Sequence, residues 1–586
     1  MPIEPIDLQR FCVAELNAEK DEWRELLKTP IGEILARDIG AEVQLSSDRT
    51  TLQPCSPTTF REGEKIALVP DDAAARAERL GDALRGAQLV FIDGIATDGA
   101  LLLQRRCPIE GSLLALPTGP LLDIHGWHKG ILQRWLEHAN ASERATELRE
   151  LLGSAPQAEQ PIPLGTMPGE RAEMLGSALR GPSAITLVQG PPGCGKTVLA
   201  ADWIASALSA GHSVGAWAFT NRACDGLLRT LHERRPDLAS SARRLGNPGG
   251  HRRDLAALGI GQAKALAPQE GSALGTTLFQ IAKATSRTLE EGRKVPEFDI
   301  AFVDEASQAT LPMLASALAA SRRLVLLGDQ RQLGPVLKSK PSEESPELHQ
   351  SAFEFLAARR PVHFLSETRR MRPSVCRLPS NAFYQGRLRS VVDWTPAPNL
   401  AIGGEPFLRL EPGLELIEVS VGARVSATPQ DEVECLLKIV RAWATEPGAS
   451  LLASAAKQLG SSPAEPHLLI SCFYRRQVVR IRSALADLPY LAALRIHVDT
   501  VERNQGASSL LSLLSVADDG APASGKHPLE WRLDPRRLNV AVTRGRIKAY
   551  VIASSRFLDL ATSRANLVSR DAWSSLRNEV NAPTGS

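Results

Sequence analysis

A glycine-rich segment between two regular elements has the residue types and spacing that bind phosphate. It follows an apolar run at 184–188 and precedes a helix-patterned stretch at 198–208. Glycines let backbone N–H groups curl around an anion, and the N-terminus of the following helix adds its positive end. Lys196 can reach the β- and γ-phosphates of a nucleoside triphosphate, and the Thr197 hydroxyl can bind Mg²⁺. The predicted nucleotide-binding residues are Gly190, Pro191, Pro192, Gly193, Cys194, Gly195, Lys196 and Thr197.

Two carboxylates follow a second apolar run. Residues 298–303 lead directly into Asp304 and Glu305. An aspartate at the end of a strand can hold Mg²⁺ through water, and a glutamate beside it can polarise the attacking water. Taken alone, this pair is typical of a solvated acidic turn, just as the glycine-rich segment alone could be a turn with an incidental lysine. Together they predict Thr197 and Asp304 as metal ligands and Glu305 as a catalytic residue.

Parallel strands must position these side chains. From about residue 164, apolar runs alternate with helix-patterned segments, which is the pattern of a parallel α/β sheet. The runs expected to be buried strands are 184–188, 214–219, 300–303 and 324–327 and, in a second set, 414–419, 467–472, 495–498 and 549–553. Two sets predict two parallel-sheet domains in tandem, over residues 161–356 and 357–586.

The first 160 residues have a different pattern. Helix-patterned stretches at about 8–37 and 127–152 bracket short alternating runs such as 65–69 and 88–92. This arrangement predicts a helical stalk that carries a small β-barrel at about 40–125. The stretch 155–163 is expected to be a linker, and the tail 581–586 to be disordered. The N-terminal region could also contact protein partners.

The bulk properties limit the class of protein. The chain has 586 residues, too many for one hydrophobic core, and its 43% hydrophobic and 23% charged content is that of an ordinary globular protein. A net charge of +2 gives no overall signal of polyanion binding. The 8 cysteines form no CxxC pair, which predicts neither a zinc site nor a disulfide framework. No signal peptide or membrane span is expected, so a cytoplasmic location is predicted.

Further motifs occur in an order that resembles the superfamily 1 helicases, which are P-loop ATPases of the AAA type. The branch most similar to this chain is the 5′-to-3′ group of nonsense-mediated-decay and immunoglobulin-mu-binding-protein-like helicases. The resemblance covers roughly residues 164–555. The matching segments are FTNRACD (219–225), GTT (275–277), DEASQA (304–309), GDQRQLGP (328–335), LSETRRMRP (365–373), FYQG (383–386), FYRRQ (473–477), TVERNQG (500–506) and RRLNVAVTRG (536–545).

The resemblance assigns roles to individual residues and implies tandem RecA-like domains. Gln332 would sense the γ-phosphate of ATP. Arg370 and Arg544, from the second motor domain, would reach this phosphate across an inter-domain cleft and stabilise the charge that builds up during transfer. The candidate contacts to a nucleic-acid backbone are Thr220, Asn221, Thr276, Thr277 and Thr500, although small hydroxyls at such places are often ordinary caps.

A basic stretch lies between two of these motifs. Residues 234–253 contain three Arg-Arg pairs, in a region, about 232–270, where the family can carry an insertion over the nucleic-acid channel. These pairs are predicted either to form a solvated basic face or to contact nucleic acid.

Four positions depart from the family pattern. Glu170 lies near the place of the glutamine that reads adenine, Thr368 replaces a glutamine, Arg369 replaces a tyrosine, and Ser508 replaces a glutamate. Arg369 could still stack on a base through its planar guanidinium group. The phosphate chemistry therefore matches the family, whereas base and sugar recognition differ from it.

The predicted function is that of an ATP-dependent, Mg²⁺-using helicase or translocase on single-stranded DNA or RNA, moving 5′ to 3′. The sequence leaves DNA and RNA open because backbone contacts dominate. The departures motivate an alternative, a nucleotide-gated clamp that hydrolyses ATP without unwinding. A fused nuclease is disfavoured, because no spaced PD…ExK pattern is found and the PDD at 70–72 follows Glu64-Lys65.

Overall fold

The chain divides into two units. In the computed structural model of the protein, the described residues are 3–36, 39–55, 60, 65–95, 100–109, 111–118, 124–137, 143–156, 161–164, 168–246, 252–340, 345–394, 406–411, 413–419, 429–462, 465–486, 488, 494–517, 529–563 and 567–581. By internal contacts, the first unit comprises Met1–Gln189, Lys196–Gln330 and Gly334–His363. The second comprises Gly190–Gly195, Arg331–Leu333 and Phe364–Ser586, so two short loop segments group with it. The finer division at residues 160 and 356 stays a prediction.

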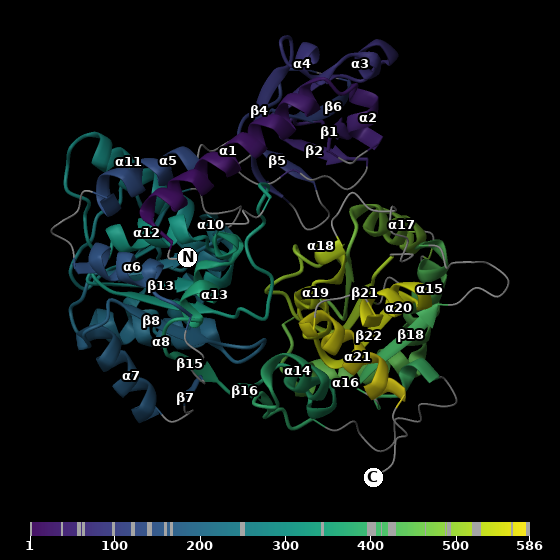
Figure 1. Cartoon of the computed structure of the whole chain (residues 1–586). Coiled ribbons are helices and arrows are strands. Elements are labelled where there is room, and N and C mark those ends of the chain that lie inside the picture. Colours follow the sequence, from purple (N-terminus) through teal and green to yellow (C-terminus); the bar gives the residue numbers. More distant parts are fainter. Residues whose placement is uncertain are drawn as a thin grey trace. The chain divides into compact units, whose positions relative to one another are not determined.

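A small closed barrel forms near the N-terminus, as the sequence predicts (Figure 1). Its antiparallel strands follow the order β1-β2-β5-β4-β3-β6. They are β1 (Ala41–Leu45), β2 (Thr51–Pro54), β3 (Lys65–Pro70), β4 (Gln88–Ile95), β5 (Leu101–Leu103) and β6 (Ser112–Pro117). A closed barrel leaves no exposed edge strand. The short helices α2 (Ile31–Ala36), α3 (Ala73–Ala77) and α4 (Leu80–Ala83) belong to the same region.

The long helix α1 (Pro5–Leu27) links the barrel to the rest of the first unit. A capping box between Glu4 and Asp7 starts it. The sequence predicts one helix over 8–37, but α1 ends at Leu27, because the residue before Pro30 is driven out of helical geometry. The other stalk elements are α5 (Ile124–Ile131), the π-helical turn η1 (Leu132–Glu137) and α6 (Glu143–Gly153).

The first unit is built on a sheet of order β11-β10-β12-β9-β13-β14-β8-β15-β7, and the pairs from β11 to β8 are parallel. Every residue of β9, β12, β13 and β14 is buried, so the sheet is covered on both faces, as apolar runs in parallel strands require. Its strands are β7 (Ile162–Leu164), β8 (Ile185–Gln189), β9 (Val214–Ala218), β10 (Ala242–Leu245), β11 (Gly261–Ala263), β12 (Ala273–Thr277), β13 (Ile300–Asp304), β14 (Leu324–Gly328) and β15 (Val362–Leu365).

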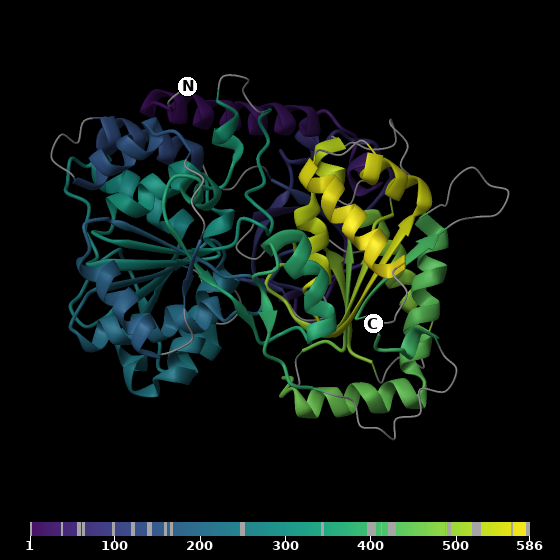
Figure 2. The same ribbon diagram turned by 60° about the horizontal axis from the view of Figure 1, so that its bottom comes forward.

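Helices pack against this sheet (Figure 2). They are α7 (Pro168–Arg180), α8 (Lys196–Ser209), α9 (Asn221–Arg234), α10 (Arg252–Ala257), α11 (Leu278–Glu290), α12 (Leu311–Ala319) and α13 (Ala352–Ala357), with the 3₁₀ turns η2 (Pro236–Ser241), η3 (Ala306–Gln308) and η4 (Pro346–His349).

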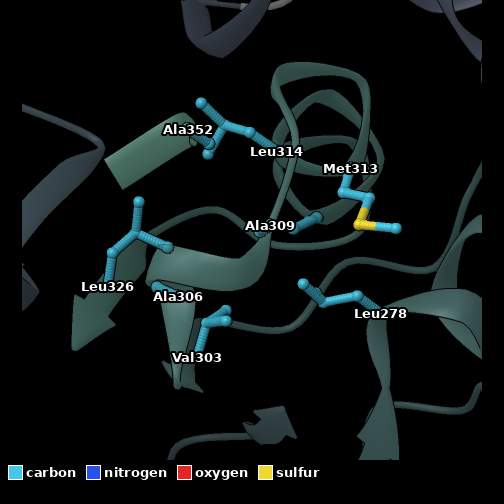
Figure 3. A pocket seen from close by; sticks show the side chains of 9 residues that line it. Leu278, Val303, Ala306, Ala309, Met313, Leu314, Leu326 and Ala352 are labelled. Carbon is cyan, nitrogen blue, oxygen red and sulfur yellow. The ribbon is translucent and has the colours of Figure 1, made fainter. Parts of the chain in front are cut away.

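A small apolar cavity lies among β13, β14, α11, α12 and α13 (Figure 3). Val303 and Ala306, on either side of the acidic pair, form part of its wall. An apolar lining cannot hold ordered water or a phosphate, so this cavity is part of the core and no ligand site. The lining residues are Leu278, Val303, Ala306, Ala309, Met313, Leu314, Ala317, Leu326 and Ala352.

The second unit contains a parallel sheet of order β18-β22-β21-β19-β20. Along β21, Leu513 packs into one apolar cluster with residues of the helices at 429–444, 446–458 and 475–486. Leu514 packs into another cluster, with residues of the helices at 373–384, 535–542, 555–563 and 567–581. This alternation shows that helices cover both faces. The strands are β18 (Leu414–Val419), β19 (Leu468–Cys472), β20 (Ile496–Thr500), β21 (Ser509–Ser515) and β22 (Gly545–Ser554), with a separate pair β16 (Glu367–Thr368) and β17 (Arg389–Ser390).

The helices of the second unit are α14 (Pro373–Tyr384), α15 (Pro429–Ala444), α16 (Glu446–Gln458), α17 (Arg475–Ala486), α18 (Leu529–Leu533), α19 (Pro535–Val542), α20 (Ser555–Ser563) and α21 (Leu567–Asn581), with the 3₁₀ turn η5 (Pro406–Leu408). The predicted tail beyond residue 581 and part of the predicted linker, 157–160, lie outside the described residues. Within the part of the chain that the structure describes, no helix is long and apolar enough to cross a membrane. The predicted fold class, tandem parallel α/β sheets with a stalk and a small barrel, is confirmed.

Candidate active site

The predicted phosphate-binding loop has the backbone shape that an anion requires. It joins β8 to α8, and the first residue of α8 is Lys196. Gly193 and Gly195 have φ angles of +76° and +79°, in the left-handed region that favours glycine. The Cys194 N–H donates to the Pro191 carbonyl at 3.2 Å and closes the turn. Alternating left-handed residues turn successive N–H groups toward one point, which is how such loops hold phosphate.

The predicted metal ligands lie together in the first unit. The Thr197 hydroxyl donates to Asp304 Oδ2 at 2.6 Å, although the two residues are 107 positions apart. Burial raises the pKa of Asp304, and the charge of Glu305 raises it further, while the Thr197 hydrogen bond and Lys196 oppose this. A buried carboxylate and a hydroxyl are hard oxygen donors, which suit Mg²⁺. The residues present therefore fit the metal that the sequence predicts.

Glu305 has an unusual backbone conformation. Its φ and ψ are 54° and 39°, in the left-handed region, and it directly precedes the turn η3. Its N–H donates to Asp304 Oδ1 at 2.9 Å, so the backbone conformation of Glu305 and the orientation of the Asp304 carboxylate, a predicted metal ligand, are coupled. Non-glycine residues in this region carry strain of about 1–3 kcal/mol and cluster at functional sites.

Gln332 and Arg544 are in contact within the second unit. They are 3% and 1% exposed, and Arg544 Nη2 donates to Gln332 Oε1 at 3.4 Å. Arg544 Nε also donates to the Val540 carbonyl at 2.8 Å, and Nη1 to the Ala507 carbonyl at 3.1 Å. Three directed hydrogen bonds fix the guanidinium plane, so the predicted phosphate sensor and one predicted arginine are held in one network.

The segment Thr368 to Arg370 contacts the phosphate-binding loop, with which it groups in the second unit. The Thr368 hydroxyl donates to the Pro192 carbonyl at 2.9 Å, and the Arg369 N–H donates to the Gly193 carbonyl at 3.0 Å. The Arg369 side chain is exposed, and Arg370 Nη1 donates to the Thr543 carbonyl at 3.2 Å. Thr368 has no predicted role, but its small hydroxyl reaches a carbonyl of the loop.

Four of the predicted nucleic-acid contacts lie at the ends of neighbouring strands of the first unit. Thr220 follows β9, and its side chain accepts the Ala223 N–H at the start of α9. Thr277 ends β12, and its side chain accepts the Gln280 N–H at the start of α11. Thr276 is fully buried and donates to the Leu245 carbonyl. Thr500 ends β20 of the second unit and is buried.

Asn221 belongs to a buried polar cluster that the sequence analysis missed. Its Oδ1 accepts from Arg244 Nη2 at 2.7 Å, and Arg244 Nε donates to Asp225 at 2.7 Å. Arg244 and Asp225 are both 2% exposed. The Arg-Arg pairs were predicted to form a solvated face or a nucleic-acid contact, and the buried side chain of Arg244 is not part of a solvated face.

The other arginines of this basic stretch also have partners. Arg234 pairs with Asp202, Arg235 pairs with Asp237, and Arg243 bonds to Gln269. The side chains of Arg252 and Arg253 lie outside the described residues. Intramolecular pairing thus offsets much of the positive charge that the sequence displays here.

The surroundings of Ser508 and Glu170, two departures from the family pattern, are as follows. Ser508 donates to Glu465 Oε1 at 2.7 Å, so a carboxylate from 43 residues away lies at the position where the motif lacks its own. Arg546 Nη1 donates to the other oxygen of Glu465 at 3.4 Å. Glu170 is exposed in the first turn of α7.

Comparisons with known proteins agree with these features. Two family models described as "AAA domain" match residues 167–399 and 348–556. The DNA replication ATP-dependent helicase/nuclease DNA2 of Xenopus laevis is 26% identical over 491 residues, which covers 76% of this chain and 45% of that protein. A regulator of nonsense transcripts 1 homolog of Arabidopsis thaliana is 29% identical over 273 residues, covering 44% of this chain and 20% of that protein. The chain thus spans less than half the length of these relatives.

Among solved structures, the Arterivirus nonstructural protein 10 (helicase) has a TM-score of 0.39 and 15% identity, covering 90% of this chain and 80% of that one. The glycine-rich loop between β8 and α8, the contact between Thr197 and Asp304 and the tandem parallel sheets are those of a P-loop ATPase. The ordered motifs and the relatives are more specific: this chain belongs to the superfamily 1 helicases, in the branch of the regulator of nonsense transcripts 1.

Proposed function

We propose that the chain is an ATP-dependent helicase or translocase that moves 5′ to 3′ along single-stranded nucleic acid. The observation that carries the proposal is the 2.6 Å contact between Thr197 and Asp304, in a member of this family. Lys196 and the loop would hold the β- and γ-phosphates of ATP, and Thr197 and Asp304 would hold Mg²⁺. The metal supplies positive charge that offsets the developing negative charge on the transferred phosphoryl group.

The protein's own residues supply the rest of the hydrolysis chemistry. Glu305 would orient and polarise the attacking water. Arg370 and Arg544 would stabilise charge on the γ-phosphoryl oxygens, which is largely electrostatic work by prepositioned cations. The bond between Arg544 and Gln332 supports a joint role, because movement of one side chain must change the environment of the other.

The contacts with nucleic acid are proposed to use main-chain groups. The side-chain oxygens of Thr220 and Thr277 cap α9 and α11 by accepting hydrogen bonds from main-chain N–H groups. The N-terminal N–H groups of these helices follow two adjacent parallel strands, β9 and β12. Helix N-termini bind phosphate oxygens without reading the bases, which suits a motor that moves along any sequence. Asn221 and Thr276 would shape this surface of the first unit, and Thr500 is proposed as a separate backbone contact in the second unit.

The test is the ATPase rate of the purified chain with and without single-stranded DNA and single-stranded RNA. We expect at least one polymer to raise kcat, and Lys196→Ala to remove the stimulated activity. Equal rates with and without both polymers, together with an unaffected Lys196→Ala variant, would contradict the proposal. The polymer that stimulates identifies the nucleic acid on which the chain acts.

The direction of movement along nucleic acid is tested with partial duplexes that carry either a 5′ or a 3′ single-stranded tail. Displacement from the 5′-tailed duplex alone is expected. Displacement from the 3′-tailed duplex alone would reverse the proposed direction. ATP-dependent binding without displacement or translocation on either substrate would favour the nucleotide-gated clamp.

A further inference from the structure

Helix α1 carries a buried carboxylate that binds the main chain of the segment Lys338–Ser339 in the first unit. Glu15 lies at mid-helix and is 2% exposed. Its Oε2 accepts the Lys338 N–H at 2.9 Å, and its Oε1 accepts the Ser339 N–H at 2.8 Å. Each carboxylate oxygen therefore binds one main-chain donor of the same short segment. Hydrogen bonds to a charged acceptor are stronger than neutral ones, so this clamp fixes the backbone there.

Neighbouring side chains hold the same segment in place. Lys338 Nζ pairs with Glu22 of α1 at 2.6 Å, in an exposed position. The Ser339 hydroxyl lies 3.0 Å from His349 Nε2, and the His349 ring packs edge-on against Phe11 of α1. One face of α1 thus contacts both Lys338–Ser339 and the turn η4.

Lys338 follows Gln332, the predicted γ-phosphate sensor, after only five intervening residues. One of the five is Pro335, whose ring fixes its own φ angle, whereas the residue before it, Gly334, has a free backbone. The connection is nevertheless only five residues long, so fixing Lys338 limits how far Gln332 can move. If Lys338 and Ser339 were released, the loop would gain conformations in which Gln332 is misplaced.

The same helix reaches the barrel. Leu8, Phe11 and Cys12 pack in the apolar cluster of the first sheet, whereas Trp23, Leu26 and Leu27 pack against the cluster of the barrel. Figure 1 shows α1 leading from α5 toward the barrel. A continuous helix of 23 residues is a stiff element, so a force on the barrel reaches Glu15.

We propose that Glu15 is a positioning residue for Gln332, through which the barrel influences ATP hydrolysis. This inference rests on the proposed function. A partner or a duplex that displaces the barrel would shift α1, loosen or tighten the two hydrogen bonds of Glu15, and change how often Gln332 is correctly placed.

The test compares Glu15→Gln with Glu22→Gln. The glutamine at position 15 keeps the size of the side chain but offers one acceptor oxygen and turns an N–H₂ group toward a main-chain N–H. Glu22→Gln alters the same helix and the same segment at an exposed pair, so it is the matched control. If Glu15→Gln does not fold, Glu15→Asp, which keeps the charge but withdraws it by one methylene, replaces it.

We expect Glu15→Gln to lower the nucleic-acid-stimulated kcat about tenfold or more, since small misplacements of catalytic groups cost that much, with less than about a twofold change in KM for ATP. The KM is expected to hold because Lys196 and the phosphate-binding loop are untouched. Glu22→Gln should match the wild type in both constants. A wild-type kcat in a folded Glu15→Gln variant would overturn the inference and leave Glu15 a purely structural residue.

Hydrogen exchange of the Lys338 and Ser339 amides gives a readout that needs no activity. Faster exchange in Glu15→Gln than in Glu22→Gln is expected, without nucleotide, and equal exchange would overturn the clamp itself. If the wild type hydrolyses no ATP with either polymer, the proposed function fails, and the exchange comparison still decides whether the clamp exists.

Discussion

At the residue scale, Glu305 combines a proposed chemical role with a strained backbone. We expect Glu305→Gln to lower kcat for ATP hydrolysis by about 10²–10⁴, because an amide cannot accept the proton of the attacking water. ATP binding should persist, since the loop and Lys196 do not change. Fluorescent-nucleotide binding beside steady-state ATPase checks this. Near-normal turnover would place the catalytic carboxylate elsewhere.

The backbone of Glu305 allows a separate prediction about stability. Glycine adopts its φ of 54° without strain, whereas alanine does not. Glu305→Gly should therefore be more stable than Glu305→Ala by about 1 kcal/mol, the size of the left-handed penalty, while both lose activity. Thermal unfolding of the two variants compares them. Equal melting temperatures would mean that the loop relaxes out of this conformation.

The Thr197 hydroxyl is the second residue-scale test. Thr197→Val keeps the shape of the side chain but removes one predicted Mg²⁺ ligand, so the Mg²⁺ concentration for half-maximal ATPase activity should rise. Thr197→Ser keeps the hydroxyl and should stay near the wild type. Titration of the ATPase rate with MgCl₂ measures both. An unchanged requirement in Thr197→Val would remove Thr197 from the metal site.

At the scale of elements, the pair of Asp225 on α9 and Arg244 on β10 joins a helix to its sheet. Asp225→Asn would leave a buried charge uncompensated, which costs about 3–5 kcal/mol. The half-exposed pair Arg577–Glu418 is a suitable control, and Glu418→Gln should cost about 0–1 kcal/mol. Calorimetric melting curves compare the two variants. A small effect of Asp225→Asn would show that the site admits water.

The double variant Asp225→Leu with Arg244→Met separates charge from shape. Replacing both members of a buried pair by apolar residues is often neutral, so it should regain most of the lost stability. Asn221 would then lose its Arg244 partner, and affinity for single-stranded nucleic acid reports whether that bond matters.

Helices and strands are predicted best where a continuous run of residues in the sequence marks them. The central strands β9, β13 and β14 begin within a residue of their apolar runs, because burial on both faces demands continuous apolar sequence. Strand β12 was recognised only as a motif, since its ALGTT sequence is small and partly polar. The helix predicted over 8–37 is too long, because α1 ends at Leu27, before Pro30.

At the scale of the whole molecule, stability should depend on pH through His467, a partly exposed histidine. Burial lowers the pKa of His467, and the charge of Arg495 lowers it further. Its Nδ1 accepts the Arg495 N–H at 3.3 Å, which only the unprotonated nitrogen can do. Below the ordinary histidine pKa of about 6.5, the unfolded chain binds a proton that the folded chain resists. The contribution of His467 is therefore full above this pH and is lost as the pH falls.

His467→Asn keeps an acceptor oxygen but does not titrate in this range. We expect its melting temperature to fall less between pH 7.5 and pH 5.5 than that of the wild type. His497→Asn, at an exposed position of β20, is the control and should follow the wild type. Parallel pH profiles of all three would mean that His467 does not contribute to acid sensitivity.

The sequence by itself determined that the residues proposed to bind phosphate and metal lie close together. A parallel sheet brings the carboxyl ends of its strands to one edge, so the motifs after β8 and β13 had to meet, and Thr197 and Asp304 do. Only the tertiary structure decided the partners across long separations. Arg244 bonds to Asp225 across 19 positions of the sequence, Ser508 to Glu465 across 43, and Glu15 to the Lys338 N–H across 323. Such contacts depend on how whole elements pack, which no local spacing encodes.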